Sequence, residues 1–348
     1  MRKFLSKIAL ALVPIVLYAA VFVAFEPNDY FGFKGKDTLL TRIKGYEGAG
    51  INSIVLGDSR LAHMDMALAK EVSGHEYYNM AFGGASLEES IDLIEYAKSV
   101  NPNLKEVVLG ISFYTLNASY NTANRIKTIE KQINNPLAYI SNLEYNVQTA
   151  AALVGVLQGV PTGENARETA TWQEKDYMQG GKALPYRKSL IAYAAILYRA
   201  CAKEGTLPSA GFYAEDMLKA MDNGTLDCEK LLFEMQSATP ESSVFKINQK
   251  ELDRLISLIA DYNKEGIKIT VVFPPMDESV RKLVCEPLGI DIAMANALTS
   301  LHATSATVLD YEWENVPLYD DKMFFDGFHL DEVYGLPTWT KTLFKEAQ

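Results

Sequence analysis

Short apolar runs alternate with helical segments along much of this chain, and that alternation limits the fold more than any other feature. Strand-like runs occur at Asn52–Leu56, Glu76–Met80 and Glu106–Ser112, with helical patterns between them. Strands and helices alternating at this spacing indicate an α/β fold with a parallel sheet. The runs are almost continuously apolar, as expected for parallel strands that are covered on both faces.

Signals at the expected helix ends favour the same fold. One helix is expected over 61–72, and a second begins after Ser86, with Glu89 three positions further on in the spacing of a capping box. The second helix should run to about Val100, because Asn101–Pro102 is a helix-ending pair. Each helix therefore connects two strands of the predicted sheet.

The alternation resumes in the last third of the chain. We expect a helix over 251–262, a strong strand over 267–273, helix over 279–298 in two pieces broken near Pro287 and Gly289, a last strand over 307–310 and a final helix over 332–345. Together with the first part, these segments predict an α/β domain over 51–348 with a three-layer parallel sheet.

The middle of the chain, about 113–247, interrupts this pattern. Helices are expected there around 139–157 and 189–202, separated by loops rich in Gly, Asn and Thr. We interpret this stretch as a largely helical insertion in the α/β domain. It is either a lid over an active site or a plain helical addition, and its residues carry no chemical motif that separates the two.

The N-terminus predicts a membrane anchor. Residues 8–25 carry no charge, and basic residues precede them at positions 2, 3 and 7. Eighteen helical residues rise roughly 27 Å, close to the hydrocarbon thickness of a bilayer. The basic flank should stay in the cytoplasm, which sends the following chain to the other side. We expect an uncleaved transmembrane helix over 1–26, a connector over 27–50 and an extracytoplasmic protein; a cleaved signal peptide is the alternative.

Composition argues against several classes of partner and cofactor. The chain has 33 basic and 44 acidic residues, a formal net charge of −11, which argues against a nucleic-acid partner. It has neither a GxGxxG motif nor a P-loop, so no nucleotide cofactor is expected. Cys201, Cys228 and Cys285 form no CxxC pair, and no metal site is expected. A disulfide between Cys201 and Cys228 stays open for a protein outside the cytosol.

The first chemical motif, Gly57–Arg60 with the sequence GDSR, directly follows the first predicted strand. A serine at such a strand-to-helix turn lies at the carboxyl edge of the sheet, where open α/β folds bind ligands. Ser59 is therefore a candidate nucleophile. Asp58 is expected to orient the turn by hydrogen bonding. Arg60 is expected to be solvated or ion-paired rather than to bind an anionic substrate.

The second motif, Asp326–His329 with the sequence DGFH, precedes the final helix. A serine hydroxyl is a poor nucleophile until a base removes its proton, and histidine is the usual base near neutral pH. A carboxylate on the other ring nitrogen fixes the tautomer and stabilises the imidazolium. Asp326 and His329 on one turn can supply both roles, so the two motifs together predict a Ser–His–Asp triad.

This order of motifs resembles the SGNH (GDSL-like) hydrolase superfamily over about 51–112 and 248–348. Asn79–Gly84, with the sequence NMAFGG, is similar to the family's glycine block. The resemblance implies a flavodoxin-like sheet, a catalytic triad of Ser59, Asp326 and His329, and no cofactor. It also implies that the backbone N–H groups of Ser59 and Gly84 stabilise the oxyanion, with Gly83 as the alternative to Gly84.

One block departs from the family pattern. The family usually has G-x-N-D after the third strand, and its Asn donates to the oxyanion. This chain has Gly110-Ile111-Ser112-Phe113, so Ser112 occupies the Asn position and becomes the candidate third donor. Asn117, a few residues further on, is an alternative donor. Loss of one such donor can lower the rate by roughly 100- to 1000-fold.

The divergent block, the N-terminal anchor and the D-G-x-H-L ending resemble one branch of the superfamily. That branch contains the DltD proteins of cell-wall D-alanylation and related O-acetylation proteins of bacterial polysaccharides. The resemblance implies an extracytoplasmic serine esterase or O-acyltransferase acting on acyl groups of cell-envelope polysaccharide or teichoic-acid-like polymers. Its expected partners are an acylated polysaccharide or polyol and a membrane-bound O-acyltransferase. The alternatives are a non-catalytic accessory protein of such a system and, third, a lipid-directed esterase.

Overall fold

The structure is a computed structural model, and it describes residues 2–120, 124–158, 186–207, 214–313, 319 and 321–347. Its contacts divide the chain into two compact units, each taken by itself below. The first unit contains the described residues of 1–48 and 124–169, and the second contains those of 49–123 and 170–348. Three stretches of the predicted insertion, 121–123, 159–185 and 208–213, lie outside the described residues.

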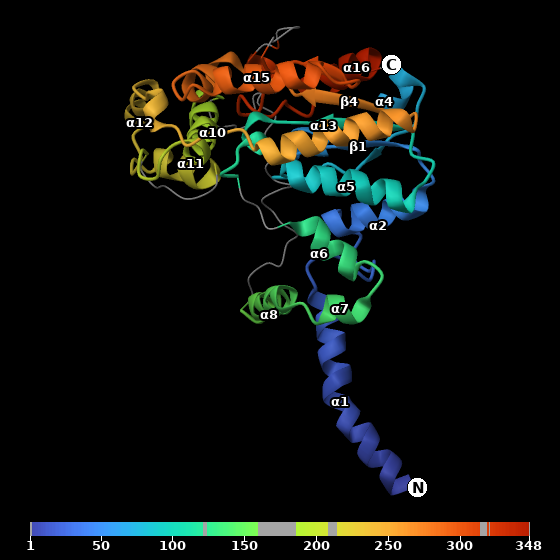
Figure 1. The fold of residues 1–348 in the computed structure, drawn as a ribbon. Helices are drawn as coiled ribbons and strands as arrows, with labels where there is room; N and C mark the ends of the chain where they lie inside the picture. Colours follow the sequence, from blue (N-terminus) through green and yellow to red (C-terminus); the bar gives the residue numbers. More distant parts are fainter. Residues whose placement is uncertain are drawn as a thin grey trace. The chain divides into compact units, whose positions relative to one another are not determined.

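The second unit is built on a five-stranded parallel sheet, which confirms the predicted α/β class (Figure 1). The strand order is β2-β1-β3-β4-β5, one of the two common orders of doubly wound sheets. The strands are β1 (Ser53–Leu56), β2 (Tyr78–Asn79), β3 (Glu106–Gly110), β4 (Lys268–Phe273) and β5 (Thr307–Asp310). The five predicted strands are thus all present, and four of them are shorter than predicted.

One face of the sheet packs against two helices that are far apart in sequence. Val55 of β1 is paired with Val108 of β3, and both are fully buried. They share an apolar cluster with α4 (Met66–Ser73) and α16 (Gly335–Glu346). Trp339 is the largest fully buried side chain of the protein's described residues and belongs to this cluster. The C-terminal helix therefore closes the sheet beside its first strands.

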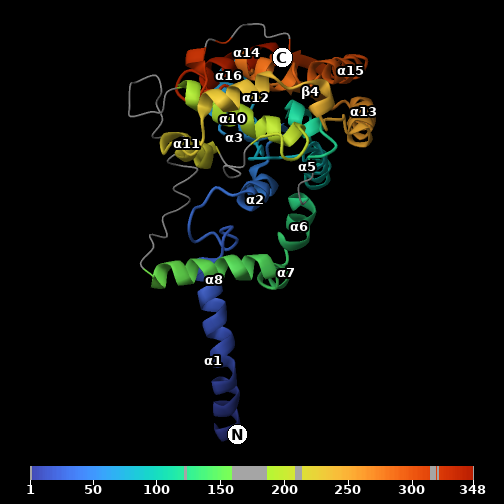
Figure 2. The same cartoon turned by 90° about the vertical axis from the view of Figure 1, so that its left-hand side faces the viewer.

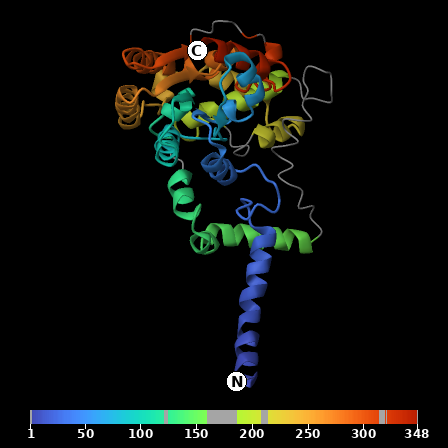
Figure 3. The same cartoon turned by 90° about the vertical axis from the view of Figure 1, so that its right-hand side faces the viewer.

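The neighbouring strand residues point to the opposite face, which is also buried. Ile54, Val107 and Val271 have no exposed surface. Right-handed crossovers put α4 on one face and α5 (Leu87–Val100) and α13 (Gln249–Lys264) on the other, because β2 lies on the opposite side of β1 from β3. Helices α5 and α13 contact each other and lie side by side in all three views (Figures 1, 2 and 3).

The helix ends follow local capping chemistry. Ser86 and Glu89 form the predicted capping box at the start of α5. The helix predicted over 61–72 is instead two helices, α3 (Ser59–Ala62) and α4. Asp65 explains the break, because its carboxylate accepts the first free N–H groups of α4 at 2.8 and 3.2 Å and so begins a new helix.

The predicted helix over 279–298 is also divided, as expected. It forms α14 (Glu278–Val280), the π-helical η3 (Arg281–Cys285) and α15 (Ile290–His302). Gly289, with a φ of 65°, precedes α15 in the left-handed conformation that glycine adopts most readily. The last helix, α16, begins at Gly335, later than predicted.

The described part of the middle stretch is helical. Within the second unit it contains η1 (Phe113–Leu116), α10 (Tyr186–Cys201), α11 (Ala214–Asp222), α12 (Cys228–Gln236) and η2 (Pro240–Ser242). Helix α10 contacts α11, α12 and η3, so it packs directly on the α/β unit. Its Cys201 is a free buried thiol, as is Cys285, and Cys228 is also free; the disulfide left open above is absent.

The first unit consists of helices, one of which lies in the segment predicted as a connector. Its helices are α1 (Arg2–Phe25), α2 (Leu39–Ala49), α6 (Arg125–Gln132), α7 (Pro136–Ile140) and α8 (Leu143–Leu157). Helix α8 contacts α1 and lies crosswise to it (Figures 2 and 3). Phe22 of α1 is buried against Tyr139, and the Tyr139 hydroxyl donates to Glu26 at 2.5 Å. These contacts hold the C-terminal end of α1.

Helix α1 forms where the apolar N-terminal run predicts a helix. Among the described residues, however, no helix has the length and apolar character needed to cross a membrane, so the predicted transmembrane helix lacks support here. Large apolar side chains of α1 are nevertheless exposed, among them Leu10, Ile15, Val16 and Leu17 at 60–73% of their surface. Helix α8 also exposes apolar side chains, including Leu143, Val147 and Leu157.

Candidate active site

The candidate nucleophile lies where the strand order reverses. Strands β1 and β3 are neighbours, and the chain leaves β1 toward β2 on one side while β3 leads to β4 on the other. Crevices at such switch points bind ligands in open α/β sheets. Ser59 begins α3 two residues after Gly57, where a Cβ would be only 3.0 Å from the Gly110 carbonyl oxygen of β3. Glycine thus lets the nucleophile turn approach the neighbouring strand.

The structure brings together the three residues of the predicted triad. The Ser59 Oγ is 2.7 Å from Nε2 of His329. The other ring nitrogen, Nδ1, is 3.0 Å from Oδ2 of Asp326. A neutral ring that donates from Nδ1 to the carboxylate leaves Nε2 as the acceptor for the serine proton. The histidine and aspartate are both 5% exposed, so the pair is largely shielded from water.

A tight turn aims the histidine. The Asp326 Oδ1 accepts the backbone N–H groups of Phe328 and His329 at 3.0 and 2.8 Å. Gly327 between them has a φ of 81°, and a Cβ there would be 2.9 Å from Val280 Cγ2. The sequence D-G-x-H therefore folds locally because the side chain of its first residue caps its own turn.

An aromatic residue from the middle stretch contacts the catalytic histidine. Tyr193 of α10 makes an edge contact with the His329 ring at 4.8 Å between centroids and stacks on Phe328 at 5.5 Å. Burial, together with the charge of Asp326, raises the pKa of Tyr193, so its hydroxyl stays protonated as a donor. The motifs in the sequence did not identify this residue, because a lone tyrosine in a helix carries no signal.

Asp58 makes more hydrogen bonds than its expected role in orienting the turn requires. Its Oδ1 accepts the backbone N–H of Arg60 at 3.0 Å, which confirms that it orients the turn. Its Oδ2 also accepts the hydroxyls of Ser112 at 2.5 Å and Tyr114 at 2.7 Å. The side chain is 2% exposed, and these three hydrogen bonds satisfy both of its buried oxygens. Burial and the Asp58 charge together raise the pKa of Tyr114.

These bonds argue against the predicted oxyanion role of Ser112. The Ser112 Oγ accepts from Nη1 of Arg60 at 3.1 Å, and its single proton is donated to Asp58. A hydroxyl has only one proton to donate. Ser112 therefore has no proton left for an oxyanion while this network is intact.

The alternative donor, Asn117, is also engaged elsewhere. Its Nδ2 donates to the Ala200 carbonyl at 3.0 Å, and its Oδ1 accepts the N–H groups of Ser119 and Lys246. The side chain therefore ties the loop after η1 to α10 and to the segment before α13. Its position after β3 in the sequence did not reveal this structural role.

The glycine block follows β2, which lies on the opposite side of β1 from β3. Asn79 at the end of β2 donates to the Leu61 carbonyl of α3 at 2.8 Å, and the Phe82 N–H donates to the Gly57 carbonyl at 3.1 Å. These bonds join the block to the nucleophile turn. Gly84, with a φ of 64°, accepts the Tyr120 hydroxyl on its carbonyl oxygen at 3.0 Å. The oxyanion roles of the Ser59 and Gly84 N–H groups stay predictions, as does the alternative Gly83.

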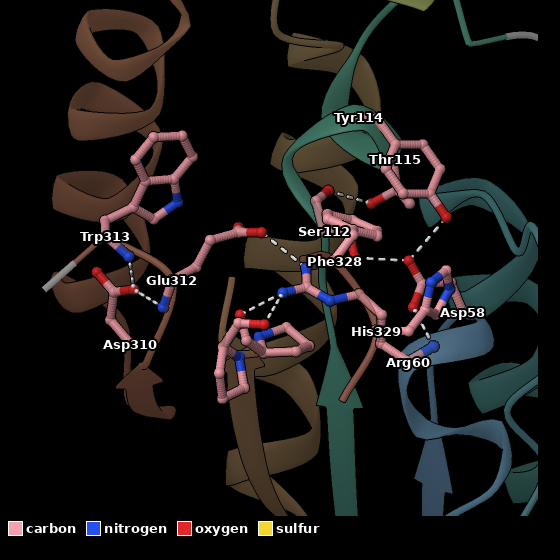
Figure 4. A network of polar contacts seen from close by, with 12 residues as sticks. Asp58, Arg60, Ser112, Tyr114, Thr115, Asp310, Glu312, Trp313, Phe328 and His329 are labelled. Carbon is pink, nitrogen blue, oxygen red and sulfur yellow. Dashed lines mark hydrogen bonds and ion pairs between the residues drawn. The ribbon is translucent and has the colours of Figure 1, made fainter. Parts of the chain in front are cut away.

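Arg60 is neither solvated nor aimed at a substrate; it is buried, and it forms an ion pair with Glu312. Its Nη1 is 2.7 Å from Oε1 of Glu312, and the two side chains are 2% and 0% exposed. Its Nη2 donates to the Pro274 and Pro275 carbonyls at 2.5 and 2.7 Å. Figure 4 shows Arg60 between Glu312 on one side and Asp58 with Ser112 on the other.

Glu312 is a buried acid with an unusual environment. Burial raises its pKa to about 7, although the neighbouring Arg60 acts in the opposite direction. Asp310 at the end of β5 holds its backbone, accepting the Glu312 N–H at 3.1 Å and the Trp313 N–H at 2.9 Å. The sequence carries no sign of this residue, because its partner lies 252 positions away.

Two further observations bear on binding. His63 is partly exposed, and its Nδ1 lies 3.2 Å from Oε1 of Glu332. No group of three or more His, Cys, Asp or Glu within the described residues is arranged to hold a metal ion.

Comparison with protein-family models and with curated proteins finds no match for this chain.

Proposed function

We propose that this chain is a serine esterase or O-acyltransferase of the SGNH hydrolase type. Its proposed substrates are acyl groups on cell-envelope polysaccharide or teichoic-acid-like polymers, with a polysaccharide or polyol as acceptor and a membrane-bound O-acyltransferase as a partner. The observation that carries the proposal is the hydrogen-bonded chain from Ser59 through His329 to Asp326. Its position at the switch point of a doubly wound sheet supports the same function.

In the proposed reaction, the Ser59 Oγ attacks the acyl carbonyl carbon while Nε2 of His329 takes the hydroxyl proton. The tetrahedral intermediate collapses, the ester bond breaks, and His329 returns the proton to the leaving alcohol. The same base then deprotonates water or an acceptor hydroxyl, which attacks the carbonyl carbon of the acyl-serine. The bond between that carbon and the Ser59 Oγ breaks, and His329 returns the proton to the serine. Asp326 keeps the proton on Nδ1 and stabilises the imidazolium.

We propose the backbone N–H groups of Ser59 and Gly84 as the oxyanion donors. Backbone donors need no side chain at the divergent third block, where Ser112 is held by Asp58. Two preorganised donors already supply much of the stabilisation that a tetrahedral oxyanion needs. The proposal therefore does not depend on the Asn of the usual family pattern.

We also propose that α1 attaches the protein to the outer face of the membrane. The exposed apolar side chains of α1, together with the basic residues at its start, support this localisation. Apolar side chains exposed along a helix are favoured at a lipid surface, because their burial there removes them from water.

A non-catalytic accessory role is the second candidate, and the missing third oxyanion donor favours it. The assembled triad opposes it, because a binding module needs no base beside a serine. Reaction of the full-length protein with a fluorophosphonate probe separates the two. We expect labelling of the wild type, none of Ser59→Ala and a steep loss in His329→Ala. A folded wild type that resists labelling would leave only the accessory role.

A further inference from the structure

We propose that Arg60 is a positioning residue for the catalytic serine and histidine, and that Glu312 is the counter-ion that holds it there. The inference rests on the proposed function, since positioning matters only if Ser59 reacts. Arg60 directly follows the nucleophile in the chain, and its side chain is almost completely buried beneath the site. The contacts of its side chain are with Ser112, Pro274, Pro275, Glu312 and Phe328.

The guanidinium group joins the ends of three strands to the nucleophile turn. It donates to Ser112 after β3, to Pro274 and Pro275 after β4, and to Glu312 after β5. Because these donors come from one planar group, displacement of Arg60 loosens all the contacts together. The backbone of Arg60 is held as well, since its N–H donates to Asp58.

The same group also contacts the histidine side of the triad. The guanidinium carbon lies 4.0 Å from the centre of the Phe328 ring, a cation–π contact, and Phe328 directly precedes His329. Arg60 is therefore covalently adjacent to the nucleophile and packed on the neighbour of the base. This arrangement fixes the relative position of two residues that are 270 positions apart in sequence.

Glu312 makes this arrangement possible because a buried cation needs a counter-charge. The groups that act on its carboxyl are Arg60, Asp310 and Asp58, and the Cys285 thiol of η3 is in electrostatic range. Since the pKa of Glu312 is raised to about 7, its charge changes within the working range of a histidine base. The positioning of Ser59 is thus expected to strengthen as Glu312 ionises.

The test measures the rate of fluorophosphonate labelling at Ser59 in full-length variants. Arg60→Lys keeps the charge but loses the planar fork, and we expect labelling to slow by at least about 10-fold, since small misplacements of reacting groups are costly. Arg254→Lys is the matched control. Arg254 is also ion-paired, with Asp92 and Glu95, but is 29% exposed on α13, and its replacement should leave the rate unchanged.

A double variant separates positioning from folding. Replacing both charges, Arg60→Met with Glu312→Met, removes the ion pair without leaving either partner as a lone buried charge, so the variant is expected to fold, and its thermal midpoint is measured beside its labelling rate. If Arg60 positions the nucleophile, labelling of this folded variant still slows at least about 10-fold. A folded double variant that reacts at the wild-type rate overturns the proposal.

A pH profile tests the role of Glu312. The labelling rate of the wild type divided by that of Glu312→Gln cancels the titration of His329, which both share. We expect this ratio to be near one at about pH 5, where Glu312 is neutral like glutamine, and to rise with a midpoint near 7. A ratio that stays flat with pH overturns the role of Glu312. Failure of the proposed function is distinguishable, because the wild type itself would then not be labelled.

Discussion

At the scale of single residues, the candidate site depends on the protonation pattern around one imidazole. Asp326 contributes twice: its Oδ1 caps the turn, and its Oδ2 accepts a hydrogen bond from Nδ1 of His329. The two oxygens therefore have separable roles. An amide at this position can keep the cap through its oxygen while presenting a donor to Nδ1, which favours the wrong tautomer.

Asp326→Asn should therefore nearly abolish reactivity without unfolding the protein. We expect the esterase or labelling rate to fall by roughly 10⁴-fold, as when the carboxylate of such a triad is made an amide. The measurement is the labelling rate together with the thermal midpoint. Asp277→Asn serves as the control, because Asp277 also caps a turn, at Ser279, and its other carboxylate oxygen accepts the Tyr186 hydroxyl. Equal rates for wild type and Asp326→Asn would rule out the triad.

The structure brings the three residues of the expected triad together, and two of them are also neighbours in the chain. Asp326 and His329 share one turn, and Ser59 follows a strand directly. Ser112 was assigned by its position in a motif, but its proton goes to Asp58, which lies 54 positions away. A sequence position does not reveal which acceptor competes for a hydroxyl proton. The hydrogen bonds around Asp58 could therefore not be predicted from the sequence.

At the scale of elements, strands and helices were predictable where apolar pattern and capping residues agree. The capping box of Ser86 and Glu89 is a local feature, and α5 begins as expected. The break before α4 was missed because the apolar pattern continues through it, while a single carboxylate, Asp65, restarts the hydrogen bonding. The contact between α4 and α16 was not predictable, since no local signal joins helices so distant in the chain.

The contact between α4 and α16 should contribute strongly to the free energy of unfolding. Trp339 of α16 is fully buried in the cluster shared with α4 and β1, so Trp339→Ala leaves a large cavity. We expect the free energy of unfolding to fall by about 3–5 kcal/mol. Lys341→Ala, an exposed change on the same helix, should alter it by less than about 0.5 kcal/mol. Urea unfolding checks both, and a Trp339 variant as stable as the control would contradict this packing.

At the scale of the whole molecule, the proposed localisation depends on α1. Its exposed apolar side chains should bind lipid, and a charge among them should oppose burial in a bilayer. We expect the full-length protein to float with phospholipid vesicles in a density gradient and Val16→Asp with Leu17→Asp to reduce the floated fraction several-fold. Phe233→Asp, at a side chain 68% exposed on α12, adds a charge elsewhere and should float like the wild type.

A result in which the α1 variant floats as well as the wild type would argue against attachment through this helix. The labelling rate at Ser59 serves as an internal check of folding in these samples. It should be the same for all three proteins, since none of the changes lies in the second unit's site.

Ser59 lies far from the other two residues of the triad in the sequence, so the reactivity of Ser59 reports whether the native fold has formed. Asp326 and His329 are set by one turn, so the only long-range contact that the triad requires is the one from Ser59 to His329. That contact forms only when the turn after β1 and the segment that follows β5 have come together at the end of the sheet. During refolding, the appearance of a reactive serine should therefore coincide with completion of the sheet, and an unreactive chain that already has native-like helix content would be a trapped intermediate.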